Sequence, residues 1–198
     1  MNDRLKQQFT FLVEIDKLKL VTRQTRLLAD NNRRENDAEH SWHLALYVMI
    51  LKEYSNMPDI DWLKVIKLVL IHDLVEIYAG DVFIYDNKGH ENKKQKELDA
   101  AVKLFALLPE DQGKEMHALW DEFENRTTPE AKFAAVVDKL QPFLHNYYDP
   151  SGGTWKQVNA TSEMETNVMS AIGENSDVLG AFLRDAIDEA VLDGRLMA

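Results

Sequence analysis

Four residues with metal-binding side chains stand far apart in this chain. His40 is alone, His72 and Asp73 are adjacent, and Asp138 follows much later. Imidazole nitrogens and carboxylate oxygens suit Mn, Co, Zn, Fe or Mg, and the absence of cysteine excludes the thiolate ligands of the usual structural zinc sites. Four protein ligands would leave coordination positions free for water and substrate. If the fold brings these side chains together, we expect one divalent metal ion per chain and hydrolytic chemistry.

The segment that carries His40 is expected to be a helix. Asn36 and Glu39 have the spacing of a capping box, in which each side chain accepts a hydrogen bond from the backbone of the other residue. The residues that follow favour a helix from residue 36 to about residue 54. His40 would then lie in the first turn of that helix.

A second helix is predicted for residues 62–79. Its first ten residues are almost all apolar, which is typical of a helix buried on every side, and Gly80 is expected to end it. At roughly 100° per residue, His72, Asp73 and Glu76 share one face, and Asp81 follows directly after the glycine. Buried charged groups are strongly destabilising when unpaired, which favours a shared cation over ordinary ion pairs with Lys or Arg.

A third helix should carry Asp138. Thr128 and Pro129 are typical of the N-cap and the first helical position, and apolar residues at helical spacing follow them. Asp138 lies within that apolar surface. Pro142 lacks the amide that would bond the carbonyl of Asp138, so a kink is predicted beside the proposed ligand.

The rest of the chain also has the apolar spacing of helices. No strand is predicted and residues 81–90 are expected to form a loop, with further helices over 3–20, 91–108, 109–124, 155–173 and 177–192. There is no internal repeat, and 198 residues are enough for one well-buried core. We therefore expect a single all-α helical bundle over residues 1–198.

Composition restricts the partners. The net charge of −11 argues against a nucleic-acid polymer, because binding to a phosphate backbone needs clustered Lys and Arg. A small anion held by a metal and a few local cations is still compatible with this charge. No apolar run approaches the ~20 residues of a membrane span, and the N-terminus has no secretory signal, so we expect a cytoplasmic protein without a membrane partner.

Three segments, AEHSWHLAL, LVLIHDLVEIYAGD and FAAVVDKLQPF, resemble the HD-domain metal-dependent phosphohydrolases, and most closely their 5'-deoxynucleotidase branch. The resemblance covers about residues 18–148, whereas the helices at about 155–192 add little to it. It implies an HD-type helical bundle in which His40, His72, Asp73 and Asp138 bind one divalent cation. The same four residues were selected above by their chemistry.

The resemblance also implies roles for three further residues. Glu76 would orient or deprotonate the attacking water, Asp81 would assist near the phosphate, and Arg23 would bind the phosphate from the first helical segment. The residues themselves leave alternatives open: Asp81 as a capping residue, Arg23 as a solvated helix charge, or Arg26 as the phosphate contact. Gln24 stands where the family pattern has Trp, which bears on selectivity for deoxyribose.

The other histidines are not expected to bind a second metal. His43 lies one turn after His40 and is expected to support the ligands from behind or to belong to the core. His90, His117 and His145 lack the spacing of a second ligand set and are expected to be structural or surface residues. The prediction is a mononuclear site.

The function that the resemblance implies is hydrolysis of a nucleoside 5'-monophosphate, with a deoxyribonucleotide as the expected substrate, by attack of metal-activated water in a homodimeric enzyme. Two alternatives remain. One is hydrolysis of a larger nucleotide, a triphosphate or an alarmone, which is disfavoured because extra phosphates call for more cationic side chains. The other is a non-enzymatic interaction protein whose helices a metal stabilises.

Overall fold

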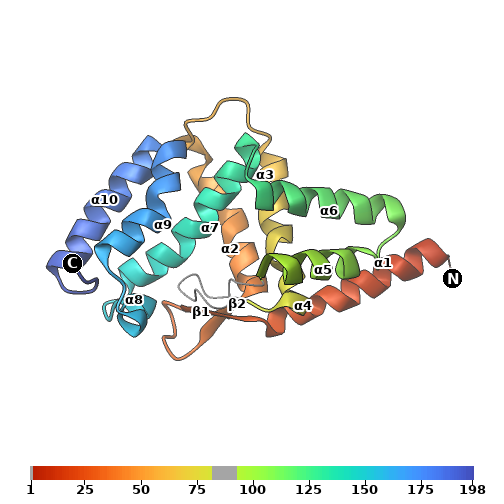
Figure 1. Cartoon of the computed structure of the whole chain (residues 1–198), viewed down its shortest axis with the longest axis horizontal. Coiled ribbons are helices and arrows are strands. Elements are labelled where there is room, and N and C mark those ends of the chain that lie inside the picture. The colour runs from red at the N-terminus through yellow and green to blue at the C-terminus, as the bar shows by residue number, and fades with distance from the viewer. Residues whose placement is uncertain (1, 82–92) are drawn as a thin grey trace.

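The computed structural model describes residues 2–81 and 93–198, and in this part of the chain almost all regular structure is helical (Figure 1). The prediction of an all-α bundle is therefore confirmed. In chain order the helices, with 3₁₀ helices labelled η, are α1 (Asp3–Glu14), η1 (Ile15–Leu20), α2 (Asp37–Leu51), η2 (Lys52–Tyr54), α3 (Trp62–Ile71), η3 (His72–Val75), α4 (Glu76–Ala79), α5 (Lys93–Phe105), α6 (Glu110–Asn125), α7 (Pro129–Tyr148), α8 (Gly153–Val158), α9 (Ser162–Asn175) and α10 (Asp177–Leu192).

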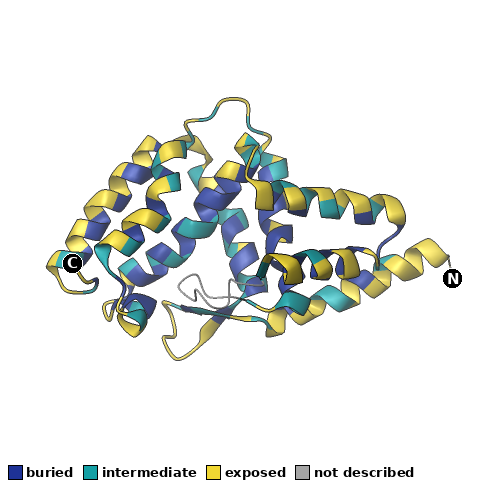
Figure 2. Cartoon of the chain, in the orientation of Figure 1, coloured by how far each residue is buried: buried dark blue, intermediate teal, exposed yellow. Residues whose placement is uncertain are grey.

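Helices α2, α3 and α7 form the centre of the molecule. Figure 1 shows α9 and α10 at one end and α1, α5 and α6 at the other. Each region has its own buried apolar cluster: one joins α7 to α8, α9 and α10, one lies among α2, α3, α6 and α7, and one joins α1, α5 and α6 to the η3–α4 segment. Figure 2 shows that the inward faces of these helices are the buried ones. Because α7 contributes to two clusters, it is held on both sides.

Local signals place the two long central helices as expected. Asn36 and Glu39 form both hydrogen bonds of the capping box at the start of α2. Thr128 Oγ1 accepts from Ala131 N at the start of α7, directly before Pro129. Helix α7 runs on through Pro142 to Tyr148, so the proline does not end it.

The prediction that no strand would form is wrong. A two-stranded antiparallel sheet joins β1 (Thr22–Arg26) to β2 (Arg34–Asn36), with Thr22 opposite Asn36 and Arg26 opposite Arg34. Arg23 therefore projects from a strand and not from a helix. The pairing is a long-range backbone interaction, which the short polar sequence of these strands does not reveal.

Some helix boundaries also differ from the predictions. The single helix expected over 155–173 is two helices, because Asn159 adopts the left-handed conformation (φ 52°) after α8 and Thr161 then caps α9. The helix expected over 62–79 tightens to a 3₁₀ turn at His72–Val75. The loop expected at 81–90 lies, except for Asp81, outside the described residues. Within 2–81 and 93–198, no helix combines the length and apolar character that a bilayer crossing requires.

The close contact of α9 with α10 gives a test of this packing. A Cβ atom added at Gly180 would lie 2.6 Å from the Cα of Gly173, whereas one added at Gly173 would lie 3.8 Å from the Cα of Gly180. We expect Gly180→Ala to lower the free energy of unfolding by about 1–3 kcal/mol through overpacking. Gly173→Ala should be neutral or stabilising by up to about 1 kcal/mol, since alanine favours helix. Urea denaturation measures both, and equal effects of the two substitutions would contradict this packing.

Candidate metal and active site

The four predicted ligand side chains meet at the centre of the bundle. His40 Nε2 lies 3.0 Å from Asp138 Oδ1, and His72 Nε2 lies 3.1 Å from Asp73 Oδ1 and 3.7 Å from Asp138 Oδ1. Ligand atoms of His40, His72 and Asp73 all lie within 4.8 Å of one another. Two ligand atoms that bind one ion tetrahedrally at about 2.1 Å are about 3.4 Å apart. The spacing therefore fits a single shared cation.

His72 presents a free lone pair to this point. Its Nδ1 donates to the carbonyl oxygen of Val69 (2.9 Å), so the proton of the neutral ring is on Nδ1. Its buried Nε2 has no hydrogen-bond partner among the described residues and faces carboxylate oxygens. Burial alone would lower the pKa of His72, but Asp73 and Asp138 raise it to about 10. The ring therefore needs either a proton or a metal ion at Nε2.

His40 is oriented from behind by Gln141. The amide nitrogen of Gln141 donates to Glu35 Oε1 (2.7 Å), a group that can only accept, so the amide oxygen faces His40. His40 Nδ1 donates to that oxygen (3.2 Å), which leaves Nε2 free on the side of Asp138. Both imidazoles thus turn the same nitrogen to the same place.

A second cluster of possible metal ligands surrounds the amide nitrogen of Gln141. Glu35, His43 and His145 offer three atoms within 4.8 Å of one another. Gln141 Nε2 lies between them, 2.7 Å from Glu35 Oε1, 3.1 Å from His145 Nε2 and 3.4 Å from His43 Nδ1. His145 Nδ1 in turn donates to the carbonyl oxygen of Arg26 (2.9 Å). His43 and His145 therefore contact the Gln141 amide, and this amide orients His40. A position behind the ligands was expected for His43.

Arg23 lies inside the site. Its Nη1 is 2.9 Å from Asp73 Oδ2 and 3.5 Å from Asp37 Oδ1, and its side chain is only 16% exposed. The alternative of a solvated helix charge is therefore wrong. Arg26 is turned away: its Nη1 donates to the carbonyl oxygen of Asn31 (2.9 Å). Of the two arginines, only Arg23 lines the central pocket.

Glu76 and Asp81 approach the same carboxylates. Burial, together with the charges of Asp73 and Asp37, raises the pKa of Glu76 to about 11. Burial also raises the pKa of Asp81, although Arg23 opposes the effect. Gly80, at φ 78°, ends α4 in a backbone conformation that side-chain-bearing residues rarely adopt, and the turn brings Asp81 to the pocket wall.

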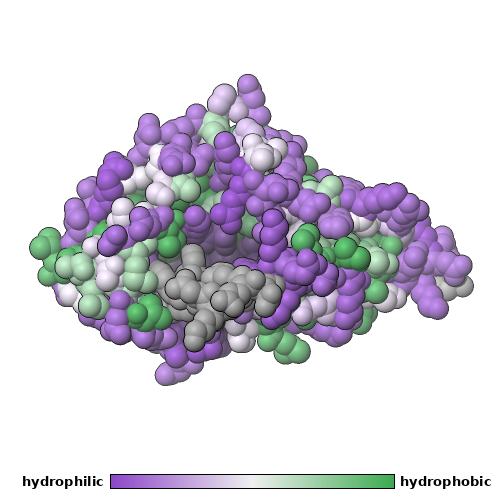
Figure 3. All heavy atoms as spheres, viewed as in Figure 1, coloured by the Kyte–Doolittle hydropathy of each residue, from purple (hydrophilic) through white to green (hydrophobic). Residues whose placement is uncertain are grey.

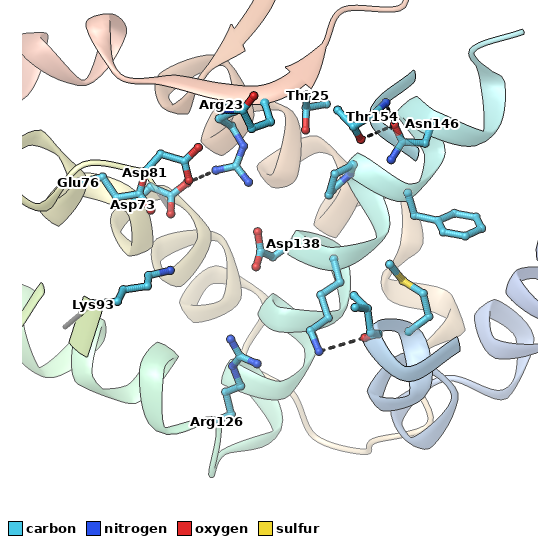
Figure 4. A pocket seen from close by; sticks show the side chains of 16 residues that line it. Arg23, Thr25, Asp73, Glu76, Asp81, Lys93, Arg126, Asp138, Asn146 and Thr154 are labelled. Carbon is cyan, nitrogen blue, oxygen red and sulfur yellow. Dashed lines mark hydrogen bonds and ion pairs between the residues drawn. The ribbon is translucent and has the colours of Figure 1, made fainter. Parts of the chain in front are cut away.

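These residues line a pocket of about 380 Å³, a size typical of small-molecule sites. Figure 4 shows Asp138 in its middle, Asn146 and Thr154 at one end and Arg126 at the other. Figure 3 views the molecule from the same side as Figure 1. Hydrophilic residues cover most of this face, including the wall of its central hollow. The pocket is lined by Arg23, Gln24, Thr25, Asp73, Glu76, Asp81, Lys93, Arg126, Asp138, Lys139, Pro142, Phe143, Asn146, Thr154, Val168 and Met169.

Four residues that surround the ligands were not predicted from the sequence to take part in the site: Glu35, Asp37, Gln141 and His145. Gln141 and His145 follow Asp138 at i+3 and i+7 on α7, and this helical spacing was a signal that could have found them. Glu35 and Asp37 flank the capping residue Asn36, and nothing in their spacing indicates that both side chains are buried at the site.

The support of His40 by Gln141 predicts a loss of metal affinity when the amide is removed. We expect Gln141→Leu to weaken Mn²⁺ binding by about 10- to 100-fold, the usual effect of losing a hydrogen bond behind a histidine ligand. Isothermal titration with Mn²⁺ measures this. Unchanged affinity would contradict the assigned orientation of His40.

A charge exchange provides the control for this experiment. In the double variant Glu35→Gln with Gln141→Glu, the new amide at position 35 can donate to the new carboxylate at position 141, which still accepts from His40 Nδ1. We expect the double variant to bind Mn²⁺ more tightly than either single substitution. A double variant no better than the worse single one would show that the amide acts only through packing.

Comparisons with known proteins agree with this geometry. The chain is 29% identical over 186 residues to the 5'-deoxynucleotidase HDDC2 of Homo sapiens, covering 83% of this chain and 89% of that protein. A predicted metal-dependent phosphohydrolase of Magnetospirillum magnetotacticum MS-1 superimposes with a TM-score of 0.92 and 47% identity over 98% of this chain and 96% of that one. An HD-domain phosphohydrolase of Listeria innocua shares the fold, with a TM-score of 0.60 at 16% identity over 93% of this chain and 85% of that one.

The profile of the HD domain matches residues 15–177, which span the four ligand side chains and the described helices from η1 to α9. With the HD pair at His72 and Asp73 converging on His40 and Asp138, the chain belongs to the HD domain family.

Proposed function

We propose that this protein is a divalent-metal-dependent phosphohydrolase that removes the phosphate of a nucleoside 5'-monophosphate, with a deoxyribonucleotide as the expected substrate. The observation that carries the proposal is the convergence of the Nε2 atoms of His40 and His72 on carboxylate oxygens of Asp73 and Asp138, two residues that line the pocket. The similarity to a 5'-deoxynucleotidase over most of both chains supports the choice of substrate.

His40, His72, Asp73 and Asp138 are proposed to hold the metal ion. Their donor set fits Mn, Co, Zn, Fe or Mg, and the buried Nε2 of His72, which has no hydrogen-bond partner among the described residues, is free to bind such an ion. When bound, such an ion polarises the phosphate and lowers the pKa of a water molecule. One ion per chain is proposed, and the Gln141 amide argues against a second ion among Glu35, His43 and His145.

Glu76 is proposed to accept the proton of the attacking water. Its carboxyl has a high proton affinity because it is buried beside Asp73 and Asp37. A positive charge at the ligands would compensate Asp73 and bring the pKa of Glu76 down toward neutral pH, where a general base is most effective. Arg23 already acts in this direction.

Arg23 and Asp81 are proposed to act on the phosphate. The guanidinium of Arg23 lines the pocket beside Asp73, where it offsets the carboxylates that would otherwise repel an anion. Asp81 faces the same space from the end of α4 and is proposed to assist near the phosphate. Burial raises its pKa, so the carboxyl holds a proton more readily than an exposed one.

The nucleoside is proposed to extend along α7. Asp138, Pro142 and Asn146 are four residues apart and all line the pocket, so one face of α7 forms its wall. Eight residues of helix span about 12 Å, enough for a phosphate, a sugar and a base. Gln24 also lines the pocket and occupies the position where the family pattern has Trp, so it is the residue to vary when sugar preference is measured.

A larger nucleotide is the second candidate. Besides Arg23, the pocket is lined by Lys93, Arg126 and Lys139, so its four basic side chains match its four carboxylates although the chain has a net charge of −11. Arg126 forms no ion pair with the other described residues. If triphosphates are hydrolysed faster than monophosphates, this candidate replaces the first.

The protein is further proposed to act in the cytoplasm as a homodimer. Helix α1 exposes the apolar side chains Leu5, Phe9, Leu12 and Val13, whose helical spacing forms one stripe that a second copy could cover. Light scattering gives the mass in solution, and a monomer at all concentrations would exclude the dimer.

Substitution of Glu76 separates an enzyme from a metal-stabilised interaction protein. We expect Glu76→Gln to lower kcat by about 10²- to 10⁴-fold while Mn²⁺ still binds, because Glu76 is a proposed base and not a proposed ligand. A panel of deoxyribo- and ribonucleoside 5'-monophosphates and triphosphates, assayed with several divalent ions, measures the activity. Glu165→Gln, which changes a buried carboxyl outside the pocket, is the control. Turnover of none of these esters by the unsubstituted protein would exclude the proposed function.

A further inference from the structure

The amide of Asn146 is held in one orientation at the end of the pocket away from Arg126. Its Oδ1 accepts from the backbone N–H of Thr154 (2.9 Å) and from Thr154 Oγ1 (2.7 Å). A backbone N–H can only donate, so the oxygen is fixed on the side of Thr154. The amide nitrogen is therefore fixed on the opposite side, as Figure 4 shows.

Gly153 makes this orientation possible. A Cβ atom at position 153 would lie 2.6 Å from Asn146 Oδ1, and the residue has φ 50°. The backbone before α8 can therefore approach the amide closely enough for the Thr154 hydrogen bonds. The α7–α8 connection thus acts as a rigid clamp on one side chain.

The amide nitrogen of Asn146 donates no hydrogen bond to another described residue. Neither hydrogen of Asn146 Nδ2 meets a hydrogen-bond acceptor among residues 2–81 and 93–198, although the residue is only 7% exposed and lines the pocket. A pre-oriented donor that opens only toward a pocket is suited to an acceptor atom of a ligand. Such a donor needs no ordering when the ligand binds.

The surroundings indicate which part of a ligand this donor meets. Asn146 lies two helical turns beyond Asp138, about 12 Å along α7. Phe143, Val168 and Met169 supply apolar pocket wall. Figure 4 shows Arg126 at the end of the pocket opposite Asn146, with Asp138 between them, and Lys139 Nζ donates to the carbonyl oxygen of Val168 (3.2 Å). With the phosphate at Arg23 and Asp138 in the middle of the pocket, a flat ring with acceptor atoms on its edge fits the space between Asp138 and Asn146.

We propose that Asn146 reads the nucleobase of the substrate, by donating from Nδ2 to a carbonyl oxygen or ring nitrogen on the edge of the base. This inference rests on the proposed function and extends it, because it makes the base part of the recognised ligand. It predicts that a sugar phosphate without a base is a poor substrate for a reason separate from the metal site.

Asn146→Asp is the sharpest test, because it preserves the shape of the side chain and replaces the donor Nδ2 with an acceptor oxygen. One carboxylate oxygen can still accept from Thr154, while the other presents an acceptor where the protein has a donor. We expect kcat/KM for nucleoside 5'-monophosphates to fall by about 10- to 100-fold, since two acceptors then face each other across a buried contact. Hydrolysis of 2-deoxyribose 5-phosphate should be unchanged, and this substrate also controls for the added negative charge.

The control variant is Asn167→Asp, the same exchange at an exposed position of α9, and it should leave both substrates unaffected. Equal losses for the nucleotides and the sugar phosphate, or no loss for either, would overturn the role of Asn146. Titration of a nucleoside 5'-monophosphate and of inorganic phosphate into the unsubstituted protein and into Asn146→Asp tests the inference without relying on catalysis. Weaker nucleotide binding by the variant with unchanged phosphate binding supports the inference even without turnover, and a failure of the unsubstituted protein to bind the nucleotide overturns it.

Discussion

Lone pairs that face one another below the protein surface are the constraint on which this structure depends. His40 Nε2 and His72 Nε2 both point at carboxylate oxygens at 3.0 to 3.1 Å, and both rings carry their proton on the other nitrogen when neutral. Without a positive charge this arrangement is repulsive. A proton on the rings or a metal ion among them removes the repulsion. The same lone pairs that would destabilise the empty site are therefore the ones that can bind a metal ion.

The surrounding protein holds this arrangement through charge balance. Asp37, Asp73, Glu76 and Asp81 lie close together, and Arg23 is a cation placed among them. The result is a set of groups with displaced proton affinities: the pKa of Glu76 rises to about 11 and that of Asp37 to about 7, largely through burial. The pKa of Asp73 is lowered although burial opposes this, because the charge of His72 favours the carboxylate. Groups whose pKa values are displaced in opposite directions are characteristic of sites that move protons.

Helix α7 connects metal binding, ligand support and ligand recognition. Asp138 faces the other ligands, Gln141 orients His40 from behind, and Asn146 offers its amide at the far end of the pocket. These residues lie within three turns of one helix, so their relative positions are fixed by backbone geometry. Apolar clusters on two sides of α7 keep the helix itself in place.

The amino-acid sequence by itself determined the ligand types, the helices that carry them and the fold class. These follow from local rules: the capping box at Asn36, the N-cap at Thr128 and the apolar run before His72 each act within a few residues. The resemblance to HD phosphohydrolases depended on the same short segments, and the profile match confirmed it.

Only the tertiary structure decided how distant residues combine. Gln141 meets Glu35 across 106 positions of sequence, and Arg23 reaches Asp73 across 50, from a strand that exists because β1 pairs with β2. Helical periodicity says which face of an element is apolar, but it does not say which polar side chains of other elements that face will meet. The buried network behind His40 and the clamped amide of Asn146 arise from that packing.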